Sequence, residues 1–173
     1  MKRIVALCLL ISLLAIASFS QSPQLRPALL NPQTVEAISA DEFRQLIAHQ
    51  QGKVILVNFW ATWCAPCVKE IPEIVKLQEK YKERGLRVIA ISLDEPEDLE
   101  TIVRPFVAKR FPGFVSYLCK EMDHDKFASV IGPAWNEIMP TNFLIDREGK
   151  LKATLVGGKS YEEFEAAIMP LLP

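Results

Sequence analysis

Two cysteines separated by two residues lie between an expected buried strand and an expected amphipathic helix. Residues 54–60 form a short apolar run with β-branched members, which is consistent with a buried strand. Residues 64–84 repeat apolar side chains at helical spacing, and Gly85 ends that pattern. Cys64 therefore stands at a helix N-terminus, with Cys67 in the first turn, where free backbone N–H groups and the helix dipole favour a thiolate.

The spacing of the two cysteines suits thiol-disulfide exchange. A thiolate is the species that attacks a disulfide, and a second cysteine three residues further on could close a small ring and expel the product. Pro66 fits the first turn of a helix, because its missing N–H has no intrahelical partner there. The same spacing also occurs in structural disulfides and in zinc sites, for which Cys119 and His124 are the other candidate ligands nearby.

The rest of the sequence alternates strand and helix patterns. Ser39 and Glu42 form a capping box that opens a helix over about 40–50. Residues 111–138 show no regular pattern. The other expected elements are a strand over 86–93, a helix over 97–110, a hairpin of strands 141–145 and 151–156, and a helix opening at 160. This order predicts an α/β fold with a central mixed β-sheet flanked by helices on both faces.

Composition bounds the class of protein. The chain has 173 residues, of which 50% are apolar and 24% are charged, as in ordinary globular proteins. This length predicts one domain with a sizeable core, plus a terminal segment. The 20 Lys and Arg residues balance 21 Asp and Glu residues without a basic tract, so no electrostatic force favours nucleic-acid binding. Four cysteines are too few for a disulfide scaffold.

The N-terminus has the layout of a secretory signal. Within residues 1–20, two basic residues precede an uncharged apolar run at 4–19, and small and polar residues follow. The run is short for a membrane span of roughly 20 residues, which favours a cleaved signal over a retained anchor. Both alternatives predict export to the periplasm or another extracytoplasmic location. We assign 21–35 as a tether or lead-in and 36–173 as the domain.

Two motifs carry a resemblance to a known family. The run NFWATWCAPC at 58–67, followed by Glu70, resembles the thioredoxin superfamily and, more closely, its exported TlpA/ResA-like thiol-disulfide oxidoreductases. The run MPTNFLID at 139–146 resembles the cis-proline loop and hairpin of that family. The resemblance covers roughly residues 35–170. It implies a thioredoxin fold with an N-terminal extension and an insertion before the cis-proline hairpin.

The resemblance also implies roles for individual residues. Cys64 would be the exposed nucleophile, Cys67 the buried resolving cysteine, and Glu70 a proton acceptor. Pro140 would be cis and packed against the disulfide, and the backbone of Met139 would pair with an extended substrate peptide. The residues expected to bind substrate are Trp63, Ala65, Pro66, Met139 and Pro140.

The sequence departs from thioredoxin itself in two ways. Asn58 occupies the position of a buried aspartate and cannot act as a general base, so proton transfer falls to Glu70, to water or to no specific group. The segment between the cysteines and the cis-proline loop is longer than in plain thioredoxin. The extra length lies mostly within 100–138, where residues 132–136 could help to shape a substrate groove.

Structural roles stay open for several of these residues. Glu70 could be a solvated helix residue. Trp60 and Trp63 could be packing residues, although Trp63 could also belong to the binding surface. Trp135 could lie in the core or in a groove. Cys119 is expected as a small buried apolar side chain more often than as a third redox partner.

The sequence and the resemblance together predict an exported thiol-disulfide oxidoreductase that reduces the disulfides of partner proteins, with a possible role in cytochrome c or metal-site maturation. The expected partners are disulfide-bearing proteins and a membrane thiol reductant, residues 4–19 could anchor the chain, and we expect a monomer without cofactor or metal. Two alternatives stay open: a thiol peroxidase, and a peptide-binding module with a structural Cys64–Cys67 disulfide. The peroxidase pattern Thr/Ser-x-x-Cys is out of register, because Thr62 lies two residues before Cys64.

Overall fold

The computed structural model describes residues 35–121, 123–132 and 135–173. The expected signal or anchor at 1–20, and the tether up to residue 34, lie outside the described residues. Among the described helices, none has both the length and the apolar character needed to cross a bilayer.

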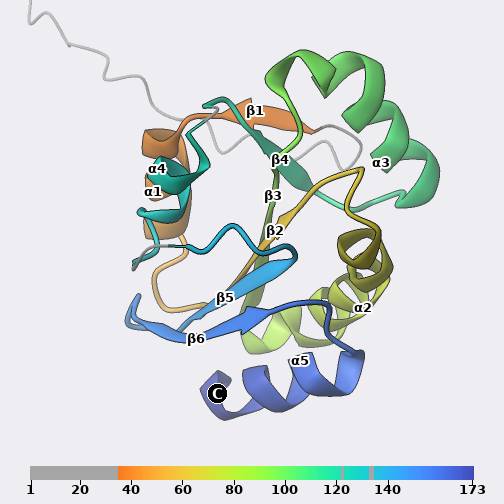
Figure 1. Ribbon diagram of the computed structural model, residues 1–173. Helices are drawn as coiled ribbons and strands as arrows, with labels where there is room; N and C mark the ends of the chain where they lie inside the picture. Colours follow the sequence, from red (N-terminus) through yellow and green to blue (C-terminus); the bar gives the residue numbers. More distant parts are fainter. Residues whose placement is uncertain (1–34, 122, 133–134) are drawn as a thin grey trace, which may run out of the picture.

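A six-stranded mixed sheet forms the centre of the domain (Figure 1). The strands are β1 (Glu36–Ile38), β2 (Val54–Trp60), β3 (Leu86–Ser92), β4 (Ser116–Cys119), β5 (Thr141–Ile145) and β6 (Leu151–Val156). They lie in the order β1-β4-β3-β2-β5-β6. The first four in this order are parallel, whereas β5 is antiparallel to β2 and forms the expected hairpin with β6. The predicted α/β fold with a mixed sheet is confirmed.

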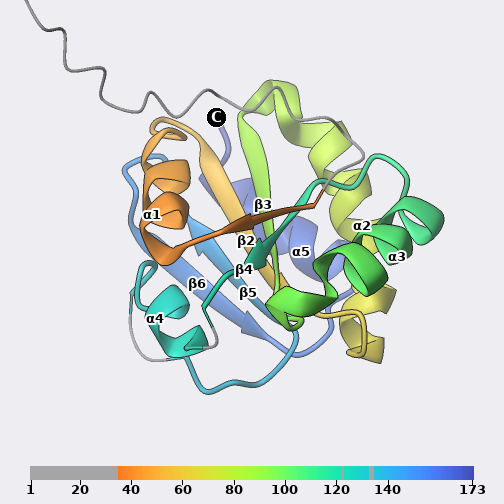
Figure 2. The ribbon, with the colours of Figure 1, turned by 90° about the horizontal axis from the view of Figure 1, so that it is seen from above.

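Helices cover both faces of this sheet, as expected. The α-helices are α1 (Ala40–Ala48), α2 (Ala65–Tyr81), α3 (Arg104–Arg110), α4 (His124–Ala128) and α5 (Tyr161–Ile168). Short 3-10 turns lie at Lys82–Arg84, Pro96–Asp98 and Met169–Leu171. Figures 1 and 2 show α1 and α4 on one face and α2, α3 and α5 on the other. Because β2 lies between β3 and β5, its carboxyl end and the cysteines that follow it lie near the middle of the edge where the strand ends.

Local sequence signals explain where the main helices begin and end. The capping box at Ser39 is present, because its side chain accepts from the Glu42 N–H while the Glu42 carboxylate accepts from the Ser39 N–H. Pro72 lies inside α2 without dividing the helix. A 3-10 turn then leads to Gly85, whose φ of 90° lies in the left-handed region that favours glycine.

The expected helix over 97–110 begins with a different geometry. A π-helical segment runs over Leu99–Val103, and the Arg104 N–H reaches the carbonyl of Leu99, five residues back. Pro105 consequently falls in the first turn of α3, where a missing N–H costs nothing. The α-helix is therefore confined to the second half of the predicted span.

Three short elements escape the sequence patterns. The strands β1 and β4 have three and four residues, and the helix α4 has five, which is too short for a periodicity to emerge. The segment before the hairpin supplies α3 and β4, and β4 inserts between β1 and β3. The segment between β3 and the hairpin therefore contributes one strand to the sheet and a helix to each of its faces.

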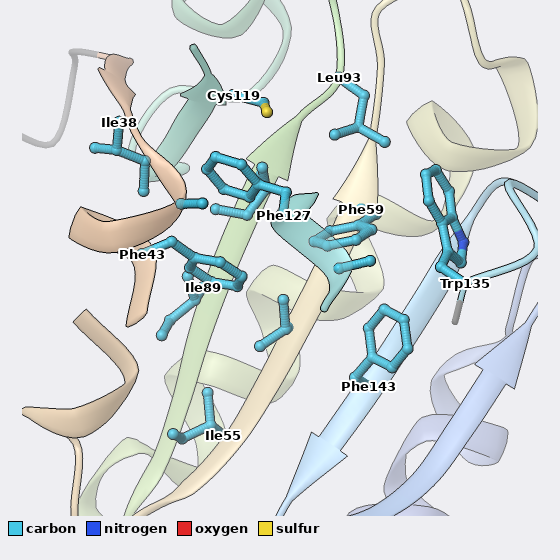
Figure 3. Close-up of a cluster of buried hydrophobic side chains, with 14 of the residues drawn as sticks. Ile38, Phe43, Ile55, Phe59, Ile89, Leu93, Cys119, Phe127, Trp135 and Phe143 are labelled. Atoms are coloured by element: carbon cyan, nitrogen blue, oxygen red, sulfur yellow. The ribbon is translucent and has the colours of Figure 1, made fainter. Parts of the chain in front are cut away.

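An aromatic cluster fills the space between the sheet and the α1/α4 face (Figure 3). Phe43 stacks on Phe127 with ring centres 5.1 Å apart, while Phe59 makes edge-to-face contacts with Trp135 and Phe143 at 5.4 Å each. Such pairs contribute about 0.5–1.5 kcal/mol each beyond the burial of their surface. Trp135 is therefore a core residue, and it is 8% exposed.

A second buried cluster lies under α2 and α3 and contains both cysteines of the motif. Trp60 is fully buried there, and its indole N–H donates to the Ser116 hydroxyl at 2.8 Å. Its rings also lie 6.3 Å from Phe106 and 5.9 Å from Phe114. The interpretation of Trp60 as a packing residue is confirmed, and its contacts fix α3 to the sheet.

Candidate redox site

A disulfide joins Cys64 and Cys67 at the N-terminus of α2, with sulfur atoms 1.96 Å apart. Cys64 is the N-cap residue, and its Sγ accepts a hydrogen bond from the Cys67 backbone N–H at 3.3 Å. Cys67 is fully buried, whereas Cys64 keeps 6% of its surface exposed. An N–H directed at Sγ, at a helix N-terminus, favours negative charge on that sulfur. Cys64 is buried in this oxidised form, but it is the less buried of the two cysteines.

Cys119, which the sequence offered as a zinc ligand, lies in a different buried cluster from Cys64 and Cys67. Cys119 belongs to the cluster between the sheet and α1, where Figure 3 shows it among apolar side chains, whereas Cys64 and Cys67 belong to the cluster under α2. Its Sγ donates to the Glu121 carbonyl at 3.0 Å. Burial raises the pKa of the Cys119 thiol to about 12. The structure therefore does not bring Cys119 to the disulfide.

The cis-proline loop leads into β5, which pairs with β2, the strand before the cysteines. The Met139–Pro140 peptide bond is cis. Pro140 is buried, and half-buried Met139 packs against the cluster that contains both cysteines. The loop is held by the Thr141 hydroxyl, which donates to the Ile138 carbonyl at 2.6 Å, and by the Gly157 N–H, which donates to the Pro140 carbonyl at 2.8 Å.

Several residues next to Cys64 in the chain are exposed. Trp63 is 67% exposed, so its interpretation as a packing residue is wrong. Ala65 and Pro66, between the two cysteines, are exposed as well. Exposed apolar side chains therefore precede and follow Cys64 in the chain, which suits contact with another protein chain.

Glu70 is a buried carboxylate on the same helix as the cysteines. It is 2% exposed, so its interpretation as a solvated surface residue is wrong. Its Oε1 accepts from the side-chain amides of Asn58 at 2.9 Å and Asn142 at 3.0 Å. Its Oε2 accepts from the backbone N–H of Lys159 at 3.1 Å. Burial raises the pKa of Glu70 above the ordinary carboxyl value, and these hydrogen bonds oppose that rise.

The sheet register explains how this cage forms. Asn58 on β2 lies directly opposite Asn142 on β5, and the Asn58 Nδ2 donates to the Asn142 Oδ1 at 2.9 Å. Asn58 is therefore a hydrogen-bond donor to Glu70. The hydrogen bond from Asn142 to Glu70 was not predicted, although a polar side chain inside an otherwise apolar strand was an available signal.

A second buried carboxylate supports the loop just before the cysteines. Asp94 is 2% exposed and accepts from the Thr62 N–H at 3.0 Å. It also accepts from the hydroxyls of Thr62 and Ser92, each at 2.6 Å. Sequence reasoning missed this residue. Because the carboxyl ends of neighbouring parallel strands meet at one edge, an acidic residue just after β3 was a signal for it.

Two grooves flank the disulfide. The α3 groove, of about 470 Å³, is lined by Thr62, Trp63, Ala65, Val68, Lys69, Pro72, Phe106, Arg110 and Phe111. The α5 groove, of about 700 Å³, is lined by Pro66, Lys69, Glu70, Glu73, Gly158, Lys159, Ser160, Tyr161 and Glu162. Of the residues 132–136 expected at a groove, Trp135 packs in the core, and 133–134 lie outside the described residues. Residues in and just after α3 line a groove instead.

A Cys-x-x-Cys disulfide that begins a helix, together with a cis proline that begins an antiparallel hairpin, defines a protein of the thioredoxin superfamily. The match to known families agrees with that geometry. The Redoxin family matches residues 32–168, and the chain belongs to this family. The predicted resemblance to the thioredoxin superfamily is confirmed.

The relatives give a closer comparison. The chain is 36% identical over 126 residues to the thiol-disulfide oxidoreductase ResA of Bacillus cereus, a match that covers 71% of this chain and 66% of that protein. It is 32% identical over 127 residues to ResA of Geobacillus kaustophilus, covering 73% and 68%. The chain therefore spans just under two thirds of the first of these relatives. Its similarity to ResA confirms the ResA-like character expected from the motifs.

Solved structures show the same fold. A thiol:disulfide interchange protein from Chlorobium tepidum aligns with a TM-score of 0.58 at 28% identity, covering 72% of this chain and 83% of that one. A DsbF homologue from Corynebacterium diphtheriae aligns with a TM-score of 0.62 at 21% identity, covering 72% and 76%. The second similarity supports the fold alone.

Proposed function

We propose that this chain is an exported thiol-disulfide oxidoreductase that reduces the disulfides of partner proteins through Cys64 and Cys67. The observation that carries the proposal is the Cys64–Cys67 disulfide at the N-terminus of α2, together with the cis Met139–Pro140 bond. The similarity to proteins named thiol-disulfide oxidoreductase ResA supports it.

The exchange runs in two steps. In the reduced protein, the Cys64 thiolate attacks one sulfur of a partner disulfide, forms a mixed disulfide and releases the other partner sulfur as a thiolate. The Cys67 thiolate then attacks the Cys64 sulfur, releases the second partner thiolate and leaves the Cys64–Cys67 disulfide. Two electrons pass to the partner, whose thiolates take up protons from water. A membrane thiol reductant restores the dithiol by the reverse exchange.

Glu70 is the proton acceptor for the second step in this proposal. Cys67 is fully buried, so its thiol proton cannot pass directly to bulk water. Glu70 follows it by three residues on the same helix, and the raised pKa of this carboxyl brings it closer to neutral pH, where a general base works best. The raised pKa and the burial of Glu70 support this assignment.

The partner binds next to the cis-proline loop. Among the described residues, no hydrogen bond reaches the backbone N–H or carbonyl of Met139, so both groups are available to an extended peptide. The exposed residues Trp63, Ala65 and Pro66 would meet the same partner around the reacting sulfur.

The proposal includes export and an extracytoplasmic setting. Residues 1–20 would direct the chain across a membrane, and residues 4–19 would either be removed or act as an anchor. A monomeric domain working on cytochrome c or metal-site maturation is the setting that the ResA-like motifs favour. The mass of the protein recovered from its host tests the first point, because cleavage near residue 20 removes a calculable mass, and a chain retained whole in the cytoplasm contradicts export.

Substitution of the nucleophile tests the activity. The purified protein is reduced with dithiothreitol, freed of it and mixed with insulin, whose disulfide reduction is followed by turbidity. Cys64→Ser should abolish the reduction, because no mixed disulfide can form, whereas the matched control Cys119→Ala should retain it. A Cys64→Ser protein that still reduces insulin contradicts the proposal, and an inactive wild-type protein favours the peptide-binding module.

The reduction potential tests the direction. Equilibration in graded dithiothreitol or glutathione buffers should give a value near or below about −220 mV, as in other disulfide reductants. A value towards roughly −120 mV would mark an oxidant that installs disulfides and would contradict a reductive role.

A further inference from the structure

The α3 groove combines aromatic rings with cations. Its lining includes Trp63, just before α2, and Phe106 and Phe111, in and just after α3. Lys69 and Arg110 are the charged residues of its lining, and both are cationic. Both cations of the groove are without an ion-pair partner in the part of the chain that the structure describes.

Both parts of this lining are held by buried residues. Before α2, Asp94 holds the Thr62 N–H and hydroxyl, immediately before Trp63. In α3, Phe106 packs against buried Trp60. A binding surface that is ordered before the partner arrives loses less conformational entropy on docking. The groove is therefore preorganised as well as exposed.

The position of Arg110 suits a carboxylate. Its guanidinium carbon lies 5.4 Å from the ring centre of Phe106 and 5.9 Å from that of Phe111. Contact with two rings restricts where the guanidinium can lie, and its N–H groups can bind a carboxylate with two parallel hydrogen bonds. The net charge of the whole chain is −1, so attraction of an acidic partner has to come from a local feature such as this one.

We propose that the α3 groove docks an acidic, partly apolar segment next to the disulfide of the partner protein. An apolar side chain of that segment fills the space between Trp63 and the α3 rings, and an Asp or Glu pairs with Arg110 or Lys69. This inference rests on the proposed function and specifies its substrate class. The α5 groove is a weaker candidate for acidic segments, because Glu73 and Glu162 line it as well.

Matched peptide disulfides test the proposal. The probes are Gly-Leu-Cys-Glu-Glu-Gly and Gly-Leu-Cys-Lys-Lys-Gly, each with its cysteine in a mixed disulfide with 2-mercaptoethanol. Pre-reduced protein is mixed with each probe, quenched with acid at intervals and analysed by mass for the Cys64–Cys67 disulfide. The measured quantity is the second-order rate constant. Uncharged bis(2-hydroxyethyl) disulfide serves as the substrate that cannot use the groove.

Charge reversal in the groove should slow the acidic probe and leave the uncharged disulfide unchanged. Wild-type protein should react faster with the acidic probe than with the basic one, and Arg110→Glu should slow the acidic probe roughly tenfold, since attraction is replaced by repulsion. The matched control Lys109→Glu carries the same charge change on the same helix outside the groove lining and should change that rate less than twofold. Replacing Leu by Gly in the acidic probe should slow it several-fold, because the apolar contact is lost.

The outcomes separate this inference from the function on which it rests. Equal rates for the acidic and basic probes, or an equal loss in Lys109→Glu and Arg110→Glu, overturn the inference while the oxidoreductase activity stands. A slower reaction of Arg110→Glu with bis(2-hydroxyethyl) disulfide also overturns it, because the effect would then lie in the sulfur chemistry. A wild-type protein that reduces none of the three substrates overturns the proposed function and the inference with it.

Discussion

The two flanks of the disulfide each hold a buried carboxylate, but the two carboxylates have different surroundings. On the α5 flank, Glu70 accepts from two side-chain amides and one backbone N–H, and it follows Cys67 on the same helix. On the α3 flank, Asp94 accepts from two hydroxyls and a backbone N–H, and it fixes the residues before Trp63. In the proposed function, the first carboxylate accepts the proton of the resolving cysteine, and the second orders the surface that meets a partner.

This difference follows from the elements that carry the two groups. Glu70 lies on α2, one turn after Cys67, so any change in its charge acts on the cysteine helix itself. Asp94 follows β3 and reaches across to the loop after β2, because β2 and β3 are parallel neighbours. A substitution on the α5 flank should therefore alter chemistry first, and one on the α3 flank should alter stability and docking first.

Removing the charge on the α5 flank should have the largest effect. Glu70→Gln keeps the size of the side chain but cannot accept a proton, so the resolving step should slow by roughly a hundredfold, as is typical when a general base is lost. The measurement is the decay of the mixed disulfide, observed by rapid quench and mass analysis. A decay as fast as in wild type would show that Cys67 loses its proton by another route.

The same substitution should change how stability depends on pH. The folded-state pKa of Glu70 is raised above the ordinary value of 4.5, so the folded protein binds the proton more tightly than the unfolded chain. The stabilising contribution is complete below pH 4.5 and is lost as the pH rises through the folded-state pKa. Urea unfolding from pH 4.5 upward should show the free energy of unfolding of the wild type falling relative to that of Glu70→Gln. If the two proteins show the same dependence on pH, this prediction is wrong.

Removing the carboxylate on the α3 flank should have a smaller effect, mainly on stability. Asp94→Ala leaves the N–H and hydroxyl of half-buried Thr62 and the buried Ser92 hydroxyl without their acceptor, which should lower the free energy of unfolding by about 2 kcal/mol. Urea unfolding measures this change, and Asp94→Asn, which keeps one acceptor oxygen, is the control. If the mixed disulfide of Asp94→Ala decays as slowly as that of Glu70→Gln, the division of roles between the flanks is wrong.

The sequence predicted some of the residues around the disulfide and missed others. The family resemblance of the motif around Cys64 and of the run at 139–146 predicted the thioredoxin fold, and the strand and turn patterns over 141–156 predicted the hairpin. Asn142 and Asp94 were missed, since each acts through a partner more than 30 positions away, which only the strand pairing brings close. The place of Phe106 in the groove lining was missed for the same reason, because its packing partner Trp60 is also distant in the sequence.

The smallest effect is expected at Cys119, which lies beyond both flanks. Burial raises the pKa of its thiol to about 12, so it stays protonated at neutral pH and offers little thiolate for exchange. Cys119→Ala should therefore change the rate of insulin reduction less than twofold. In the reduced wild-type protein, iodoacetamide at pH 8 should label Cys64 well before Cys119, as followed by peptide mass analysis. Rapid labelling of Cys119 in the folded protein would contradict this prediction. It would show a third reactive thiol in the domain, so thiol exchange would not be confined to Cys64 and Cys67.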